Sequence, residues 1–330
     1  MKPLYPKFKL VAPLCLVFLI QACSPPKPGT YKNDEISSGK RSDFHNLNTT
    51  ALKYIKANSL KELQLMMSKE MIDNSGNERQ VERMSNRLTD NDYDLVEEYY
   101  VVAKHKGDDS VAASGTDVNR HKLKFNVAVQ EMYFAFFAPK KSDNKYMISL
   151  VYSKLSYGWK ITKLGLGEYT ANGKTGPELA KLAKEEYDKK YLISAANNMQ
   201  LALSCLNPSP VWEYADTAAT DRFYDQVFKE AGKKNRYPIV LTQLPTRPMV
   251  LSVSMQRNDT WSAPNVWYMT HISIKDTNEV KKENLEVRKQ LSKLLPGIDK
   301  DNKYVTYTAF NEFPTASKSV DRFEMTDKLP

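Results

Sequence analysis

The cysteine at position 23 has the surroundings that point most clearly to a chemical event. Three lysines among the first nine residues precede an apolar run over 10–20, and the small Ala22 stands directly before Cys23. A basic segment followed by a short apolar run is typical of a secretory leader, and this run is shorter than the ~20 apolar residues that a membrane-spanning helix needs. The sequence therefore predicts export, with a thiol at the point where the leader ends.

The tetrapeptide Ile-Gln-Ala-Cys at 20–23 resembles the lipobox of bacterial lipoproteins. The resemblance implies a signal peptide over 1–22, a diacylglycerol on the Cys23 thiol and a further chain, such as palmitate, on the freed amine. Gln21 departs from the usual occupant of its position, and Ser24 stands where Asp would signal retention in the inner membrane. In a Gram-negative source the resemblance thus implies the outer membrane. An ordinary secretory leader is the alternative, but Ser-Pro-Pro at 24–26 suits a membrane tether.

The charge of the chain is basic but dispersed. The formal net charge is +9, and removal of a leader with three lysines and no acids leaves +6 (9 − 3). Pairs such as Lys140-Lys141 and Lys233-Lys234 are scattered, whereas a nucleic-acid-binding protein concentrates basic residues on one face. We therefore expect no nucleic-acid partner and only a mild attraction to anionic lipid headgroups.

The cysteines leave no pair for a disulfide inside the mature chain. Cys15 departs with the leader and Cys23 is acylated, so that Cys205 remains alone and stability must come from burial. Cys205 lies in the apolar run 201–206 with no evident His or basic neighbour. This setting predicts a buried, inert thiol and not a nucleophile.

The sequence contains no complete catalytic, nucleotide-binding or metal-binding motif. Gly-Lys-Thr at 173–175 lacks the glycine spacing of a phosphate-binding loop, and Thr175 with Glu178 reads as a helix capping box. Asp-Lys-Asp at 299–301 lacks the glycine and glutamate of a calcium loop, and His271 has no second ligand at metal spacing. We expect no cofactor and no metal, and we interpret the chain as a binding protein more readily than as an enzyme.

The predicted elements divide the exported chain into four parts within an α+β fold class. The Pro-, Gly- and Ser-rich stretch 23–42 predicts a flexible tether, and 43–170 has helices followed by antiparallel strands. Residues 171–235 read as a helical connector, and 236–330 as a second, smaller α+β unit. This last part belongs to no family that we recognise.

Hydrophobic periodicity places the individual elements. Helical spacing predicts helices around 52–71 and over 78–88, with methionines as core filler. Alternation of apolar and polar residues predicts strands, which we expect over 95–103, 123–137, 146–152, 159–164, 249–256, 266–274, 304–310 and 320–325. Helices are also expected over 177–206 and 216–231 and from a cap at Asn278, and a turn is expected at 156–158.

The order of helices before an antiparallel meander, with Gly-Trp-Lys-Ile at 158–161, resembles the cystatin-like roll of the nuclear-transport-factor-two-like superfamily. The resemblance covers residues 43–169 and implies a curved sheet wrapped around an N-terminal helix. Members of this superfamily serve more often as binding or assembly modules than as enzymes, and the enzymes place an Asp-His pair or a lone Asp in the roll's pocket. His105 and His121 flank Gly-Asp-Asp at 107–109, which reads as a hairpin tip, so we interpret both as surface residues.

Two functions from different classes follow from these patterns. The first is a non-catalytic lipoprotein that presents binding or assembly modules at the cell envelope. The second is a small-ligand carrier or an enzyme that uses the concave face of the roll. Five aromatic residues are candidate liners of that concave face: Tyr99, Tyr133, Phe136, Tyr152 and Trp159. A deep pocket with a buried acid or histidine would favour the second function, and a face filled by its own aromatic side chains would favour the first.

Overall fold

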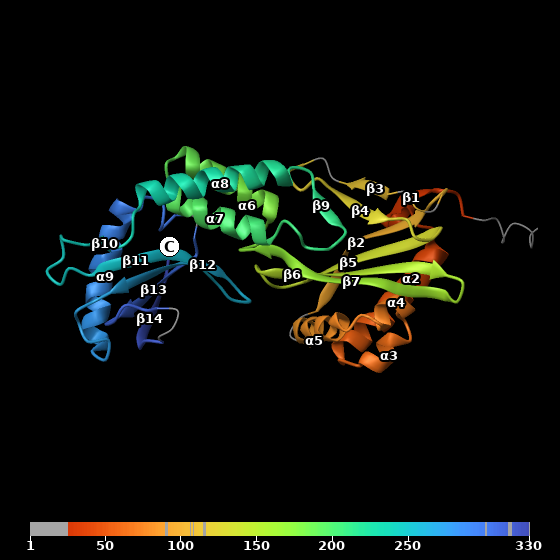
Figure 1. Ribbon diagram of the computed structural model, residues 1–330, viewed down its shortest axis with the longest axis horizontal. Helices are drawn as coiled ribbons and strands as arrows, with labels where there is room; N and C mark the ends of the chain where they lie inside the picture. The colour runs from red at the N-terminus through yellow and green to blue at the C-terminus, as the bar shows by residue number, and fades with distance from the viewer. Residues whose placement is uncertain are drawn as a thin grey trace, which may run out of the picture.

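Alternating apolar residues build two sheet-containing units that lie side by side along the longest axis of the molecule (Figure 1). The structure is a computed structural model that describes residues 26–89, 92–105, 107, 109–114, 117–300, 302–315 and 319–329. The predicted leader, Cys15, Cys23, Asp108 and Asp301 lie outside these ranges. The described residues form a mixed α+β fold, as the sequence predicts.

The first unit is built on a six-stranded antiparallel sheet in the order β1-β2-β5-β6-β7-β8. Its strands are β1 (Gly29–Lys32), β2 (Tyr93–Val102), β5 (Glu131–Pro139), β6 (Lys145–Leu155), β7 (Gly158–Ala171) and β8 (Lys174–Thr175). The strands predicted over 95–103, 146–152 and 159–164 are confirmed, and so is the turn before Gly158, whose φ of 104° suits glycine.

Helices cover one face of this sheet, and a small second sheet covers the other. The helices are α2 (Ser38–Lys56), α3 (Leu60–Gln64), α4 (Lys69–Ile72) and α5 (Gly76–Thr89). Apolar side chains of these helices form one core with Tyr100, Tyr133 and Tyr152 of the sheet. The small sheet, in the order β3-β4-β9, consists of β3 (Asp109–Ser114), β4 (His121–Asn126) and β9 (Trp212–Tyr214). Met67, Met71 and Met84 are buried core residues, which confirms the predicted role of the methionines.

The flexible tether predicted over 23–42 is wrong from Gly29 onward. Residues 29–32 form β1, which pairs with β2, and the short helix η2 (Asn33–Glu35) and the first turn of α2 follow. Composition alone does not predict the regular structure of this segment, because contacts with residues far along the chain stabilise it. Ile36 is buried, and the Asn33 side chain accepts a hydrogen bond of 3.0 Å from the backbone N–H of Glu98.

The single strand predicted over 123–137 is also wrong, because this run divides between two sheets. β4 belongs to the small sheet and β5 to the centre of the large one, with a turn between them. Every residue of β5 is buried, because helices pack on one of its faces and the small sheet packs on the other. A strand that is buried on both faces carries a continuous apolar run, so its start cannot be read from alternation.

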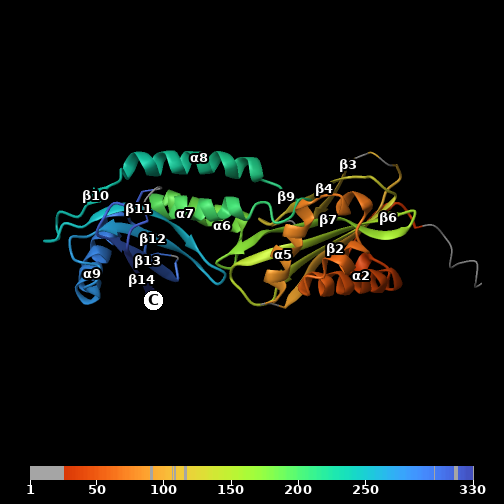
Figure 2. The same ribbon diagram turned by 60° about the horizontal axis from the view of Figure 1, so that its bottom comes forward.

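The helical connector predicted over 171–235 contains three long helices but is not separate from the unit that follows. The helices are α6 (Gly176–Asp188), α7 (Leu192–Ser204) and α8 (Thr217–Lys234). Residues of α7 and α8 share one core with the C-terminal strands, and Figure 2 shows α8 above α7 and α7 above the sheet. The sequence of α7 is apolar on nearly all sides, which is typical of a helix buried within a core.

The five-stranded sheet of the second unit has the order β10-β11-β12-β13-β14, with β12 and β13 parallel and the other pairs antiparallel. Its strands are β10 (Ile239–Val240), β11 (Met249–Arg257), β12 (Ser262–Met269), β13 (Tyr304–Phe310) and β14 (Arg322–Lys328). The predicted hairpin of β11 and β12 is confirmed, although β12 ends earlier than expected. The crossover helix α9 (Thr277–Leu294) is capped by Asp276, whose carboxylate accepts from the N–H of Glu279, and not by Asn278.

Candidate functional site

The five aromatic residues proposed as liners of one concave face lie on two opposite faces of the first sheet. Tyr133, Tyr152 and Trp159 point into the core beneath α2, whereas Tyr99 and Phe136 point toward the small sheet. Successive residues of a strand face opposite sides. Tyr99 and Tyr133 stand on neighbouring strands β2 and β5, but in register with Phe134 and Tyr100 respectively, so that they face away from each other.

The face beneath α2 is filled by side chains of the chain itself. Phe44 of α2 is fully buried, its ring stacks on that of Tyr133 with centroids 4.0 Å apart, and it meets Trp159 edge-on at 5.1 Å. Tyr152 is also fully buried. These contacts occupy the space in which a ligand of the concave face would have to lie.

A buried carboxylate nevertheless lies at the seam between α2 and β2. Glu98 has no exposed surface, and its carboxylate accepts a hydrogen bond from Arg41 Nε at 2.5 Å. The hydroxyl of Tyr133 donates to the same carboxylate at 2.7 Å, and His45 Nε2 lies 3.0 Å from it. Asn48 donates to the Tyr133 hydroxyl at 2.7 Å. Burial, together with the bond to Glu98, raises the pKa of Tyr133 far above its usual value.

A second acid–histidine pair lies on the opposite face of the same strand. The interpretation of His121 as a surface residue is wrong: it is 5% exposed and its ring stacks on Trp212 at 3.5 Å between centroids. Its Nε2 atom lies 3.1 Å from the Glu97 carboxylate, to which Tyr99 also donates at 2.6 Å. His105, in contrast, is exposed as expected. The His121 contacts hold the small sheet on the large one.

Burial alone would raise the pKa of Glu97, but hydrogen bonds from His121, Tyr99 and Lys32 outweigh it and lower the pKa to about 2. A lowered carboxyl pKa stabilises the folded state at pH values above its normal value of 4.5, and this stabilisation is lost as the pH falls toward 2. We expect Glu97→Gln to lose about 3 kcal/mol of unfolding free energy at neutral pH and nearly nothing at pH 2.

Urea titrations at a series of pH values measure this difference between wild type and Glu97→Gln. Glu213→Gln is the matched control, because Glu213 pairs with Lys122 within the small sheet but the two side chains are 37% and 41% exposed. The control should change the free energy of unfolding by less than about 1 kcal/mol at every pH. A Glu97→Gln deficit that stays constant from pH 7 to pH 2 would contradict the role of the Glu97 charge.

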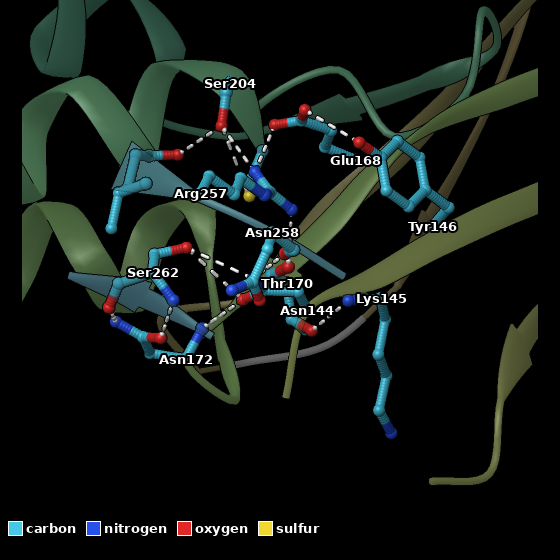
Figure 3. Close-up of polar contacts among 12 residues, drawn as sticks. Asn144, Lys145, Tyr146, Glu168, Thr170, Asn172, Ser204, Arg257, Asn258 and Ser262 are labelled. Atoms are coloured by element: carbon cyan, nitrogen blue, oxygen red, sulfur yellow. Dashed lines mark hydrogen bonds and ion pairs between the residues drawn. The ribbon is translucent and has the colours of Figure 1, made fainter. Parts of the chain in front are cut away.

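The two units meet at a polar joint that Figure 3 shows in close-up. Asn144, between β5 and β6, is buried and donates to the carbonyl of Asn258 at 2.6 Å and to the Ser262 hydroxyl at 3.2 Å. Asn172, in the turn after β7, donates to the Ser262 carbonyl at 2.8 Å, and its own carbonyl accepts from the Ser262 N–H at 2.8 Å. Two side-chain amides of the first unit thus satisfy the backbone at the start of β12.

Arg257, at the end of β11, reaches back into the first unit. Its guanidinium pairs with the Glu168 carboxylate and donates to the Thr170 carbonyl at 3.1 Å and the Ser204 hydroxyl at 3.2 Å (Figure 3). Cys205 lies nearby, and burial raises the pKa of its thiol. The predicted buried position of Cys205 is therefore confirmed.

A cleft of about 350 Å³ opens beside this joint. Tyr93, Lys141, Asp143, Tyr146 and Thr260 are among its lining residues. Burial raises the pKa of Tyr93 to about 12, so this hydroxyl stays protonated and can donate a hydrogen bond.

Ion pairs between the units border the cleft. Arg87 of α5 pairs with Asp259 in the loop between β11 and β12, and Lys303 pairs with Asp143. Arg87 also lies over the Tyr146 ring, 4.1 Å from its centroid. A neighbouring hollow of about 330 Å³ shares Arg87, Tyr146 and Asp259 and adds Arg83.

The cleft has the chemistry of a binding surface. Its cationic groups and tyrosine hydroxyls can donate hydrogen bonds to a polar or anionic partner, and Asp143 and Asp259 can accept them. The residues that line it include no histidine and no cysteine, and its two aspartates are each engaged in an ion pair with Arg87 or Lys303. Within the described ranges, no group of three or more His, Cys, Asp or Glu residues could hold a metal ion.

Sequence reasoning missed the joint and both acid–histidine pairs. A signal for the pairs exists in Glu97-Glu98, because two adjacent acids within an apolar strand must face opposite sides of the sheet, and each then requires a partner. No comparable signal marks Asn144, Asn172 or Arg257, because their partners across the joint are 87 or more positions away along the chain.

No protein-family model, no curated protein and no solved structure matches this chain. No helix among the described residues is long and apolar enough to cross a membrane.

Proposed function

We propose that this chain is a bacterial lipoprotein, anchored to the cell envelope by acyl chains on Cys23, whose two units form a non-catalytic binding or assembly module. The anchor is supported by the basic segment, the apolar run and the tetrapeptide at 20–23. In a Gram-negative source the outer membrane is the proposed location, because Ser24 and not Asp follows the cysteine.

We also propose that the first unit is a cystatin-like roll. The support is a long helix, α2, that packs against a six-stranded antiparallel sheet, with Phe44 at the centre of the contact. In that superfamily a binding role is the more frequent one. A face filled by Phe44, Tyr133 and Tyr152 supports assembly through the outer surface of the unit more than ligand uptake inside it.

The observation that carries the binding role is the cleft between the units. Its polar lining contains no histidine or cysteine, and the ion pairs Arg87–Asp259 and Lys303–Asp143 border it. The joint at Asn144 and Asn172 holds the two walls in a fixed relation, which reduces the entropy lost when a partner binds across both units.

A pulldown from detergent-solubilised envelope tests this proposal. Wild type should retain a partner that the cleft variant Arg83→Glu/Lys141→Glu loses, because both side chains are exposed and line the hollows. The matched control Lys229→Glu/Lys275→Glu makes the same charge change on the second unit and should retain the partner. If wild type sediments as a bare monomer under all conditions, or if both double variants retain the same proteins, a binding role of the cleft is refuted.

The second candidate function is a small-ligand carrier or an enzyme at the face beneath α2. The pairing of buried Glu98 with His45, whose side chain is 43% exposed, favours it because an acid and a histidine meet at the edge of the roll. Binding of small molecules that disappears in His45→Ala, with the fold intact by circular dichroism, would support this candidate over the first.

A further inference from the structure

Five neighbouring strands of the first sheet, β1, β2, β5, β6 and β7, begin or end on the same side of the molecule, which we call the tether end. The strand register defines it as a row: Gly29 pairs with Val102, Val102 with Glu131, Met132 with Ser153 and Ser153 with Lys160. Beyond this row lie the residues that precede β1, the segment after β2 and the hairpin tip between β6 and β7. In Figure 1 the chain enters at this end, and the second unit lies at the opposite end of the long axis.

The start of β1 determines how far the tether end can be from the bilayer, if Cys23 carries the proposed lipid. Six residue steps separate Cys23 from Gly29, and six extended residues span at most about 20 Å. The predicted tether of 23–42 would have allowed a much longer reach. Because residues 29–32 are paired with β2, the lipid would hold the tether end close to the membrane surface.

The exposed side chains at the tether end combine positive charge with apolar surface. Lys27, Lys104 and Lys154 are exposed, and they stand before β1, after β2 and at the end of β6. Tyr157, at the tip of the β6–β7 hairpin, is 48% exposed, and Leu65, in the turn after α3, is 75% exposed. Lysine and tyrosine side chains of this kind are favoured at membrane–water interfaces, where the charged or polar end meets the headgroups.

Lys160 joins the segments that carry Leu65 and Tyr157. Lys160 Nζ donates to the Leu65 carbonyl at 2.6 Å and lies 5.8 Å from the centroid of the Tyr157 ring. The contact fixes the turn after α3 beside the hairpin tip. Leu65 and Tyr157 are therefore presented by ordered segments on one side of the molecule.

The acids of this end do not cancel its charge. Glu131 is buried and accepts hydrogen bonds from both Lys40 and Lys154, so that two lysines face one carboxylate. Asp34, in the short helix after β1, is bound by Arg41. Among the side chains named here, lysines outnumber acids, and Lys27 and Lys104 are exposed.

We propose that the tether end is a membrane-docking surface for a bilayer with anionic headgroups, and that docking orients the molecule with its second unit pointing away from the membrane. The lysines contact phosphate groups, while Tyr157 and Leu65 enter the headgroup layer. This inference rests on the proposed lipid anchor for its orientation, but the surface itself belongs to the folded chain. In this arrangement the cleft between the units faces the space beside the membrane and not the bilayer.

Vesicle binding by the chain 24–330, which carries no lipid, tests the surface apart from the anchor. It should co-sediment with phosphatidylglycerol vesicles at low salt and not with phosphatidylcholine vesicles, and salt should weaken the binding. In Lys27→Gln/Lys104→Gln/Tyr157→Ser, partition onto the anionic vesicles should fall at least about 25-fold, from roughly fivefold for each lysine.

The matched control is Lys229→Gln/Lys275→Gln/Val240→Ser, which removes the same charge and one exposed apolar side chain from the second unit. It should bind as wild type does. Equal binding by the two triple variants, or no binding by the wild-type chain, would overturn the docking surface. Failure of the anchor has a different signature, since it would leave this vesicle result intact and would show only as an unmodified Cys23 in the mature protein.

The orientation is tested in the acylated protein reconstituted into phosphatidylglycerol vesicles. A fluorophore attached at Tyr157→Cys should be quenched by headgroup-labelled lipid, and one attached at Val240→Cys should not be. Both positions are exposed, whereas the natural Cys205 is buried and should not react. Equal quenching at the two positions would overturn the proposed orientation.

Discussion

Replacement of Glu98 by alanine should lower the free energy of unfolding by about 3–5 kcal/mol. The substitution leaves Arg41, the Tyr133 hydroxyl and His45 without the carboxylate that they now share inside the protein. The cost is large because Glu98 is completely buried, so that water cannot replace it as a partner without a rearrangement of α2. Denaturant titration followed by far-ultraviolet circular dichroism measures the change.

Asp34→Ala is the matched control, because Asp34 pairs with the same arginine. Its side chain is 91% exposed, so loss of this pair should cost no more than about 1 kcal/mol. The comparison separates the effect of burial from the effect of Arg41 itself. A Glu98→Ala variant as stable as Asp34→Ala would show that the α2–β2 seam does not depend on a buried charge.

Replacement of Phe44 by alanine should also cost about 3–5 kcal/mol, since a fully buried aromatic ring is removed and a cavity remains. The ring is stacked on Tyr133 and lies edge-on to Trp159, so neither neighbour can fill the space without leaving its own contacts. The variant should therefore acquire an apolar cavity beneath α2, detectable by the binding of a small aromatic probe that wild type excludes.

Phe313→Ala is the control for this substitution, because that side chain is 57% exposed and its loss should have little effect on stability. The probe result bears on function as well as stability. Probe binding to wild type at the face beneath α2 would contradict a filled concave face and would favour the small-ligand carrier.

Local sequence patterns predicted those helices and strands that depend on residues close together in the chain. The capping box of Thr175 and Glu178 starts α6, with the Glu178 carboxylate accepting from the Thr175 N–H at 2.8 Å. The strand 304–310 is found with its predicted bounds as β13, because its alternating apolar residues face one core. Such features depend on spacing along the chain, and the sequence displays that spacing directly.

The errors arose where distant contacts decide the structure. Residues 29–32 look like spacer in composition, and only their pairing with β2, about 70 positions away, makes them a strand. The helices over 176–234 were expected to form a connector, but most of α7 is buried because a sheet formed by later residues packs on it. Apolar periodicity reports that a helix is buried and does not report which element buries it.

The candidate site shows the same contrast between local patterns, which the sequence displays, and distant contacts, which it does not. The five aromatic residues are buried or partly buried, as apolar residues in strands should be. They lie on two faces of the sheet, because the pairing register of each strand decides which face each of its residues points to. The acids at Glu97 and Glu98 carried a readable signal, whereas Asn144 and Arg257 gave none. Polar residues that join two units are indistinguishable from surface residues until the partner backbone is placed against them.

The lipid anchor is the central claim, and membrane fractionation at high salt with mass spectrometry of the mature N-terminus tests it most directly. Two acyl chains anchor a protein effectively permanently, whereas lysines near anionic lipid contribute only ~1 kcal/mol each and are screened by salt. Wild type should stay in the membrane pellet with a modified Cys23. Cys23→Ala should remain as an uncleaved precursor, still held by its apolar leader.

The decisive form replaces residues 1–23 with a cleavable secretory leader that lacks the cysteine. Our account predicts that this protein is folded and fully released into the soluble fraction at high salt, while wild type in the same preparation stays in the pellet with an acylated N-terminus. An unmodified Cys23 in mature wild type, or a leader-swapped protein that stays in the pellet at high salt, would contradict it.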